Sequence, residues 1–288
     1  MCSNPTGCGI WCYKMKLETL DIICCPVCKG TIQLDIQEAA EDNVIKGTLS
    51  CGQCNRHFEI RDGLPNLIFP ETLKPSNFKE QKIYDQRARW YDLRNRLSNI
   101  KHGDWGYIFF EERRKKSLTN LLELKENTSV LETGAGTGRF LQTIYREIGE
   151  GGKLHGSDIS HEMIKIAAKK IEANKFKAEL LLANASYLPY RSALFDAVFH
   201  TGGINTFADK KLAIEEMCRV AKQSAKIVIS DEGLAPGKEK TRSGQKIIKR
   251  DAFYATKPPV DLIPDNICDL KVSWSDSGLY WKIAFSKS

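Results

Sequence analysis

The sequence predicts an α/β protein in which a mainly parallel sheet ends in an antiparallel hairpin and follows a small cysteine-rich domain. Three observations lead to this prediction. From residue 128 onward short apolar runs alternate with helical patterns, the last residues hold two β-prone runs, and eight of the ten cysteines lie within the first 54 residues. Strands that alternate with helices form βαβ units, which build parallel sheets.

The elements of the expected sheet follow one another closely. We expect strands over 129–132, 153–158, 178–183, 194–200 and 226–230, and helices over 139–148, 161–173 and 211–221. The runs 270–274 and 279–285 flank the turn-forming residues 275–278, which favours a hairpin. An antiparallel edge on a parallel sheet gives a permitted mixed sheet. Residues 31–50 are predicted to form short strands around a turn near 41–43.

The composition indicates a globular enzyme-sized protein. A hydrophobic fraction of 42% and a charged fraction of 27% over 288 residues are ordinary for a protein with a real core. No run of about 18 apolar residues predicts a membrane helix, and residues 1–11 do not resemble a secretory signal. We therefore expect a cytoplasmic protein. The net charge of +7 is compatible with RNA as a partner or with a basic but unspecialised enzyme surface.

Two CxxC sequences stand out in the cysteine-rich start. Cys25-Pro-Val-Cys28 and Cys51-Gly-Gln-Cys54 are separated by 22 residues. Each short loop puts two sulfurs on the same side, and two loops that face each other complete a tetrahedron around Zn²⁺. Four protein ligands leave no open position, so we expect a structural zinc ion. Redox dithiols or free thiols are the alternative.

Other candidate ligands lie near these loops. Cys24 is interpreted as a bystander, and His57 either substitutes as a ligand or is an ordinary histidine. Cys2, Cys8 and Cys12 are either free thiols of a tail or a second soft-metal site.

Residues 20–70 resemble a known family of small proteins. The likeness rests on Cys25-Pro-Val-Cys28-Lys29-Gly30, Cys51-Gly-Gln-Cys54, Phe58-Glu-Ile and Arg61-Asp-Gly-Leu-Pro-Asn-Leu. These sequences resemble the zinc-ribbon proteins that activate certain RNA and protein methyltransferases. The resemblance implies a zinc-ribbon module that is fused in cis to its enzyme.

A glycine-rich loop follows the first strand of the expected sheet. Gly134, Gly136 and Gly138 have the spacing GxGxG, whereas a dinucleotide-binding loop needs a small residue at position 139, where this chain has Arg139. Glu132 precedes the loop. A carboxylate is repelled by a pyrophosphate but attracts the cationic amino group of a methionine-like moiety. The loop therefore favours S-adenosylmethionine as the cofactor.

Asp158 is the second candidate cofactor residue. It ends the second expected strand, 20 residues after Gly138. An acid at this place accepts hydrogen bonds from both ribose hydroxyls, and the alternative is a helix N-cap or loop acid.

Several stretches resemble class I S-adenosylmethionine-dependent methyltransferases. They are residues 133–140, 157–159, 183–190 and 195–196. The paired Tyr84-Asp85 and Tyr91-Asp92, followed by His102-Gly-Asp-Trp105, resemble the N-terminal cap of the ubiquinone and menaquinone C-methyltransferases, within the methyltransferase type 11 group. The likeness spans about 80–232 and implies a Rossmann-like methyltransferase sheet. We divide the chain into a Cys-containing tail (1–20), a zinc ribbon (21–70), a helical cap or linker (71–125) and a class I methyltransferase domain (126–288).

The resemblance also implies roles for individual residues. Asn184 and Ala185 are expected beside the adenine, Thr201 near the sulfonium end, and Thr137 in contact with the cofactor from the glycine loop. Ile159 joins them as the neighbour of Asp158. The chain departs from the family in two places that matter: residues 223–225 replace the usual Pro-Gly-Gly, and residues 200–205 do not match the quinone enzymes closely.

The acceptor stays open between two hypotheses. The first is a small quinone-like or aromatic molecule, with Tyr84, Tyr91 and Trp105 capping the pocket or forming the packed face of the cap helices. The second is RNA or a translation protein, favoured by the zinc ribbon and the basic residues of 113–116 and 236–250. His200 is a weak candidate for a catalytic base, and the alternative is a packing histidine. A non-catalytic binding protein and a metalloid methyltransferase are the further alternatives.

Overall fold

We describe the protein from a computed structural model, which covers residues 13–100 and 107–288, with the side chains of residues 93–100 and 107–111 left aside. Its strands are β1 (Met15–Lys16), β2 (Ile32–Ala40), β3 (Asn43–Cys51), β4 (His57–Arg61), β5 (Leu64–Asn66), β6 (Ser129–Thr133), β7 (Lys153–Asp158), β8 (Glu179–Leu182), β9 (Phe195–Thr201), β10 (Ala221–Glu232), β11 (Ile267–Trp274) and β12 (Tyr280–Lys287). Its α-helices are α1 (Pro75–Ile100), α2 (Tyr107–Thr119), α3 (Leu141–Ile148), α4 (His161–Ala173), α5 (Lys210–Val220) and α6 (Arg242–Arg250).

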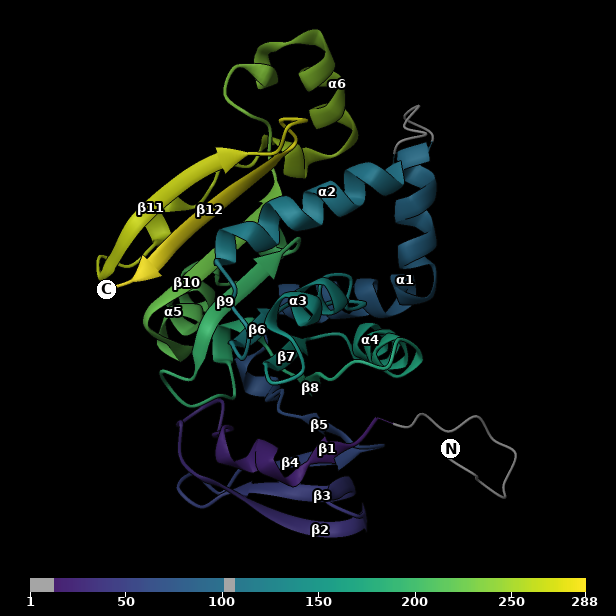
Figure 1. Ribbon diagram of the computed structural model, residues 1–288, viewed down its shortest axis with the longest axis vertical. Helices are drawn as coiled ribbons and strands as arrows, with labels where there is room; N and C mark the ends of the chain where they lie inside the picture. Colours follow the sequence, from purple (N-terminus) through teal and green to yellow (C-terminus); the bar gives the residue numbers. More distant parts are fainter. Residues whose placement is uncertain (1–12, 101–106) are drawn as a thin grey trace.

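The strands belong to one 12-stranded sheet, in the order β1-β3-β4-β5-β8-β7-β6-β9-β10-β12-β11, with β2 paired to β3 (Figure 1). The pairs from β8 to β10 are parallel, and β12 and β11 are antiparallel, so the expected parallel sheet with an antiparallel hairpin is confirmed. The main difference is β10, which begins at Ala221 rather than at the expected 226. A register shift interrupts its pairing with β9 between Ala221 and Lys226. The residues at this shift break the apolar pattern, so the sequence did not indicate where the strand begins.

Both faces of the parallel strands are buried, as βαβ crossovers require. Alternate residues of β6 face opposite sides: Leu131 joins one apolar cluster and Val130 the other. The first cluster contains Ile214 of α5, and the second contains Ile144 of α3 and Ile164 of α4. This double burial explains why the strands consist of nearly continuous apolar residues.

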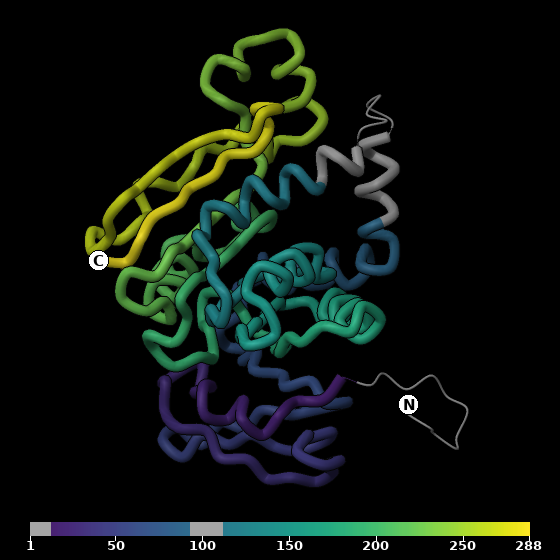
Figure 2. Tube along the Cα trace, viewed as in Figure 1, coloured from purple at the N-terminus to yellow at the C-terminus, as the bar shows by residue number. Residues whose placement is uncertain are grey.

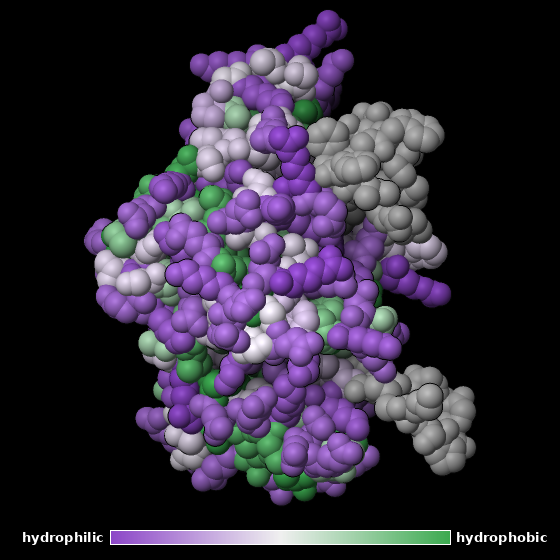
Figure 3. All heavy atoms as spheres, in the orientation of Figure 1, coloured by the Kyte–Doolittle hydropathy of each residue, from purple (hydrophilic) through white to green (hydrophobic). Residues whose placement is uncertain are grey.

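The cysteine-rich region continues this sheet rather than standing apart from it. Asn66 of β5 pairs in parallel with Leu182 of β8, and the Leu67 amide donates to the Leu182 carbonyl at 2.9 Å. Leu49 and Phe58 of the small domain belong to the same apolar cluster as Leu131. The two regions therefore share both a sheet and a core. Figure 3 shows a mostly hydrophilic face, with hydrophobic residues gathered at the lower end, where the cysteine-rich region lies.

Two segments lie outside the sheet. Helices α1 and α2 form the expected helical stretch, and α1 packs along α4. The chain between β10 and β11 carries α6 and projects at the end of the molecule opposite the cysteine-rich region (Figure 2). Among the described residues we find no helix with the length and apolar character needed to cross a membrane.

Candidate cofactor pocket and metal centre

A cavity opens over the carboxyl ends of the parallel strands. This edge is where open α/β sheets bind their ligands, because the loops after the strands diverge there. Helix α1 covers the cavity from outside. Its lining residues are Asn77, Glu80, Tyr84, Tyr91, Gly134, Gly136, Asp158, Ile159, Met163, Ala183, Asn184, Ala185, Gly203, Thr206 and Phe207.

The predicted cofactor residues divide into two groups around this cavity. Those that line it are Gly134, Gly136, Asp158, Ile159, Asn184 and Ala185. Glu132, Thr137, Gly138 and Thr201 are not among the lining residues. Six of the ten residues that the sequence singled out therefore line the cavity, and four do not.

The three glycines of the loop have positive φ angles of 65°, 55° and 70°, which explains the residue type. A Cβ on Gly134 would lie 3.0 Å from His200, and one on Gly138 would lie 3.0 Å from Ala167 of α4. A Cβ on Gly136 would meet no atom within 4 Å, because this residue faces the cavity. The outer glycines thus allow close packing, and Gly136 leaves room for a ligand.

Asp158 lines the cavity at the end of β7. Its Oδ2 accepts from the Gly136 amide and its Oδ1 accepts from the Ser160 amide, both at 2.8 Å. Burial raises the pKa of Asp158 to about 6, so the side chain is ionised at neutral pH. Each oxygen keeps a lone pair, which suits the two hydroxyls of a ribose.

Glu132 supplies a second buried acid beneath the glycine loop. Its side chain is almost fully buried, and its Oε2 has no hydrogen-bond partner among the described residues. Burial, and then the charge of Asp158, raise its pKa well above the usual range. A buried acid without a partner is costly unless a cation compensates it. This orphaned oxygen fits the cationic methionine end of S-adenosylmethionine.

Helix α1 contributes an aromatic wall. Tyr84 and Tyr91 lie seven residues apart, which is close to two helical turns, so both face the cavity. Their rings meet edge to face with centroids 6.4 Å apart. Both tyrosines line the cavity, and their capping of a bound acceptor stays a prediction; Trp105 lies outside the described residues.

The acids that follow the tyrosines fix α1 to the cofactor loop, a role that the sequence pattern did not reveal. Asp85 accepts from the Ser160 hydroxyl at 2.5 Å, at the N-terminus of α4. Asp92 accepts from the Thr137 hydroxyl at 2.8 Å and from the Lys170 ammonium at 2.5 Å. The recurrence of Tyr-Asp after seven residues was the available signal, because a spacing of about two helical turns puts the two aspartates on one face of α1.

His200 is enclosed and does not line the cavity. It is fully buried, and its Nδ1 donates to the Thr133 carbonyl at 2.7 Å. Its ring packs against Phe207 with centroids 5.0 Å apart. Burial lowers its pKa to about 4, so the ring is neutral at physiological pH. The geometry favours the packing role, since the ring supports Gly134 from below.

The four predicted metal ligands meet in one cluster. The Sγ atoms of Cys25, Cys28, Cys51 and Cys54 all lie within 4.8 Å of one another. Cys25 and Cys54 are 3.6 Å apart, and Cys28 and Cys51 are 3.4 Å apart. A tetrahedron with Zn–S bonds of about 2.3 Å has sulfurs about 3.8 Å apart, so this donor set fits a tetrahedral metal.

Among the described residues, Cys24, Cys218, Cys268 and His57 do not join this cluster. The His57 Nδ1 lies 2.9 Å from the Ser50 hydroxyl. Cys24 is buried, and its amide donates to the Pro189 carbonyl at 2.9 Å. Cys2, Cys8 and Cys12 lie outside the described residues.

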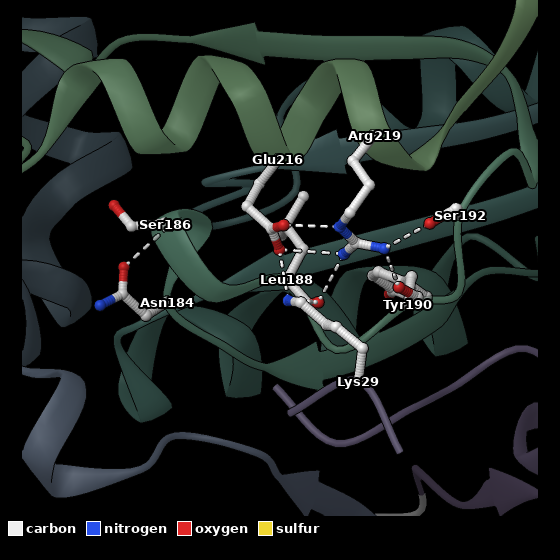
Figure 4. A network of polar contacts seen from close by, with 8 residues as sticks. All are labelled: Lys29, Asn184, Ser186, Leu188, Tyr190, Ser192, Glu216 and Arg219. Atoms are coloured by element: carbon white, nitrogen blue, oxygen red, sulfur yellow. Dashed lines mark hydrogen bonds and ion pairs between the residues drawn. The ribbon is translucent and has the colours of Figure 1, made fainter. Parts of the chain in front are cut away.

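A polar network connects the first metal loop to the cofactor pocket (Figure 4). Lys29, directly after Cys28, donates to Glu216 of α5 at 2.7 Å and to the Leu188 carbonyl at 3.2 Å. Arg219 holds the same Glu216 carboxylate through Nε at 2.5 Å and also donates to the Tyr190 carbonyl at 2.7 Å. The loop 184–192 begins at the pocket residues 184 and 185. It is thus held by Lys29 from the small domain and by Arg219 from α5.

One residue of each basic stretch contacts the β11–β12 turn. Arg113 of α2 lies 3.7 Å from Asp276, and the Lys238 ammonium donates to the Ser277 carbonyl. The stretches 113–116 and 236–250 therefore each reach the same turn through one side chain.

Two family models match this chain. A model described as "Methyltransferase domain" matches residues 124–281, and one described as "Trm112p-like protein" matches residues 16–63. A demethylmenaquinone methyltransferase of Shouchella clausii (strain KSM-K16) is 30% identical over 155 residues, which are 52% of this chain and 62% of that protein. The corresponding protein of Bacillus mycoides (strain KBAB4) is 28% identical over the same length. The chain thus spans about 62% of the length of these relatives.

Solved structures show the same fold at low identity. Phosphoethanolamine N-methyltransferase 2 of Haemonchus contortus, in complex with S-adenosyl-L-methionine, is similar with a TM-score of 0.51 and 15% identity, over 61% of this chain and 52% of that chain. Geranyl diphosphate C-methyltransferase from Streptomyces coelicolor A3(2) is similar with a TM-score of 0.50 and 13% identity, over 62% of this chain and 79% of that chain.

Proposed function

The chain belongs to the methyltransferase domain family, and we propose that it transfers a methyl group from S-adenosylmethionine to an acceptor. The observation that carries this proposal is the pair of buried acids at the pocket. Asp158 suits the ribose hydroxyls, and the orphaned oxygen of Glu132 suits the cationic end of the cofactor. A cationic ligand end would compensate the buried Glu132 and a pyrophosphate would not, so these acids favour this cofactor over a dinucleotide.

The cofactor would extend along the carboxyl edge of the sheet. Asn184 and Ala185 follow β8, where the adenine is expected, and Asp158 follows β7, where the ribose is expected. The methionine end then lies over β6 and β9. S-adenosylmethionine supplies an electrophilic methyl group, and the chain positions the acceptor in line with it and excludes water. Tyr84 and Tyr91 would close the pocket against solvent.

We propose that Zn²⁺ occupies the cysteine cluster and has a structural role. Four thiolates would fill its coordination shell, so no position is left for catalysis. The ion would hold together the small domain, whose core is continuous with that of the methyltransferase region.

We propose a small quinone-like or aromatic molecule as the acceptor. Tyr84, Tyr91 and Phe207 contribute three aromatic rings to the cavity lining, which suits a flat acceptor ring. The similarity to demethylmenaquinone methyltransferases points to the same class. The alternative is RNA or a translation protein, favoured by the Trm112p-like region and by the basic residues around the β11–β12 turn.

The test begins with isothermal titration of the zinc-loaded protein with S-adenosylmethionine. We expect binding by the wild type and a loss of about 100-fold in affinity in Asp158→Ala, because two hydrogen bonds to a charged group contribute about 3 kcal/mol. Asp261→Ala, on the surface, is the matched control. A well-folded wild type that does not bind the cofactor would refute the proposal.

Methyl transfer to reduced 1,4-naphthoquinone and to total RNA then separates the acceptors. RNA methylation should weaken steeply between about 50 and 200 mM salt, as counterion release requires, whereas turnover of a small quinol should hardly change.

A further inference from the structure

We propose that the acidic pair at the end of β10, Asp231 and Glu232, lies beside the cofactor cavity where the acceptor binds, and that Glu232 accepts the proton of the acceptor during methyl transfer. The inference rests on the proposed function and adds a residue outside the family motifs identified above. It names the class of acceptor as an aromatic hydroxyl compound, whose ring carbon becomes nucleophilic when the hydroxyl loses its proton.

The order of the strands places the acceptor near this pair. Residues after β8, β7, β6 and β9 line the cavity in that spatial order, from Asn184 to Gly203. Since the adenine is expected at the β8 end, the reactive methyl group lies toward β9. The next strand of the sheet is β10, and its last residues are Asp231 and Glu232. An acceptor in line with the methyl group would therefore meet these acids.

Asp231 accepts three hydrogen bonds from backbone amides. Its Oδ2 accepts from the Gly203 amide at 3.1 Å and from the Asn205 amide at 2.7 Å. Its Oδ1 accepts from the Glu232 amide at 2.8 Å. The same bonds shape the turn after β9, which contributes Gly203 to the cavity wall.

Glu232 is the member of the pair that exchanges a proton. Burial, and then the hydrogen bond and charge of Asp231, raise the pKa of Glu232 to about 8. The charge of Arg114 acts in the opposite direction. A carboxyl group with a pKa near the working pH is suited to general acid–base catalysis. Its neighbour His200 is neutral and buried, so it does not compete for the proton.

The groups around Glu232 suit an aromatic anion. Tyr280 pairs with Glu232 across β10 and β12, and its hydroxyl lies 3.5 Å from that of Tyr254. The Arg114 guanidinium lies 4.2 Å over the Tyr280 ring. Burial raises the pKa of Tyr254, so it stays protonated and serves as a donor. Aromatic rings, phenol donors and one cation can together bind a flat ring that acquires negative charge.

The proposed step conserves atoms and charge. Ionised Glu232 takes the proton of the acceptor hydroxyl, and the resulting phenolate attacks the sulfonium methyl group through an ortho carbon. A carbon–carbon bond forms and the sulfur–methyl bond breaks, leaving neutral S-adenosylhomocysteine. The ring carbon then loses its proton to solvent, and Glu232 returns its proton to the oxygen, so that one proton is released overall.

The test compares the wild type with Glu232→Gln, using reduced 1,4-naphthoquinone as the probe. For the wild type we expect kcat to rise with pH and level off above about 8, as the carboxyl ionises. Glu232→Gln should lower kcat by about 100-fold or more and flatten this profile. Its affinity for S-adenosylmethionine should stay within about twofold, because Glu232 does not line the cofactor cavity.

Two further variants make the result decisive. Glu232→Asp keeps a carboxyl group and should retain a pH-dependent, partly reduced kcat. Glu239→Gln removes a carboxyl group from the segment between β10 and β11 and should behave as the wild type. Unchanged kcat and pH profile in Glu232→Gln would overturn the assignment while leaving the proposed function intact. A wild type that binds S-adenosylmethionine but leaves the quinol unmethylated would overturn the acceptor class, and the assignment with it.

Discussion

The metal cluster and the cofactor pocket are assembled in opposite ways. The cluster takes four identical ligands from two short loops that lie within 30 residues of one another, Cys25 to Cys54. The pocket takes different residue types from α1 and from the ends of four strands, between Asn77 and Phe207. The first site is therefore encoded by local spacing, whereas the second exists only once the whole sheet has formed.

The two sites also differ in how their polar groups are satisfied. The thiols of the cluster face one another, and a single ion would complete the set. At the pocket, the orphaned Oε2 of Glu132 remains buried without a partner among the described residues. This difference indicates that the cluster is built for stability and the pocket is built to receive a ligand, which leads to three tests in order of decreasing effect.

Loss of a metal ligand should have the largest effect. In Cys51→Ser the ion loses one of its thiolates, and since the small domain shares its core with the sheet, we expect the whole chain to lose roughly 5 kcal/mol of stability. Thermal unfolding, together with measurement of bound zinc, checks this expectation. Cys268→Ser, at an exposed position, is the control. Equal stability of the two variants would show that the ion is dispensable for folding.

Acidification should weaken cofactor binding, with an effect of intermediate size. Because burial raises the pKa of Asp158 to about 6, protonation below this pH removes the acceptor of the ribose hydroxyls, and affinity should fall by up to about tenfold per pH unit. Without cofactor the sign is reversed: the raised pKa means that ionising Asp158 costs stability as pH rises from about 4 to 6.

Titration of S-adenosylmethionine from pH 7 to 5 measures this dependence. In Asp158→Asn the dependence of cofactor affinity on pH should become weaker. What remains would come from Glu132, because the pKa of Glu132 is also raised. An unchanged slope in the variant would assign the titration to Glu132 instead.

The smallest effect is expected from the variant that tests whether the small domain influences cofactor binding. Lys29→Ala removes the link from the first metal loop to Glu216 and to the loop 184–192. Because the lysine is one-third exposed, we expect a loss of only about 1–2 kcal/mol of stability and a few-fold weaker cofactor binding. Lys46→Ala, elsewhere in the small domain, should leave both quantities unchanged. Full cofactor affinity in Lys29→Ala would mean that the network serves stability only.

Much of this contrast could be predicted from the sequence, and the reasons are physical. The CxxC spacing predicted the cluster because thiolate geometry depends on a few neighbouring residues. The apolar runs predicted β6 to β9 because a doubly buried strand has a strong pattern. Asp158 and the glycine loop were found because both follow directly after such strands.

The missing parts depend on contacts distant in the sequence. Asp92 binds Lys170, 78 residues later, and no local pattern indicates this partner. Glu232 acquires its raised pKa first from burial under elements that come before and after it, and then from Asp231. The early start of β10 was missed because a register shift separates Ala221 from the apolar run.

The parallel pairing of β5 with β8 has a consequence for biosynthesis. Asn66 leaves the ribosome more than 100 residues before its partner Leu182, so β5 presents an unpaired edge while the rest of the chain is made. In the reverse situation, a chain lacking the small domain would expose the β8 edge, with its buried Leu180, Leu181 and Leu182. Fusion into one polypeptide supplies one copy of β5 for each copy of β8. By the time β8 is synthesised, the strand that covers its edge is therefore already present.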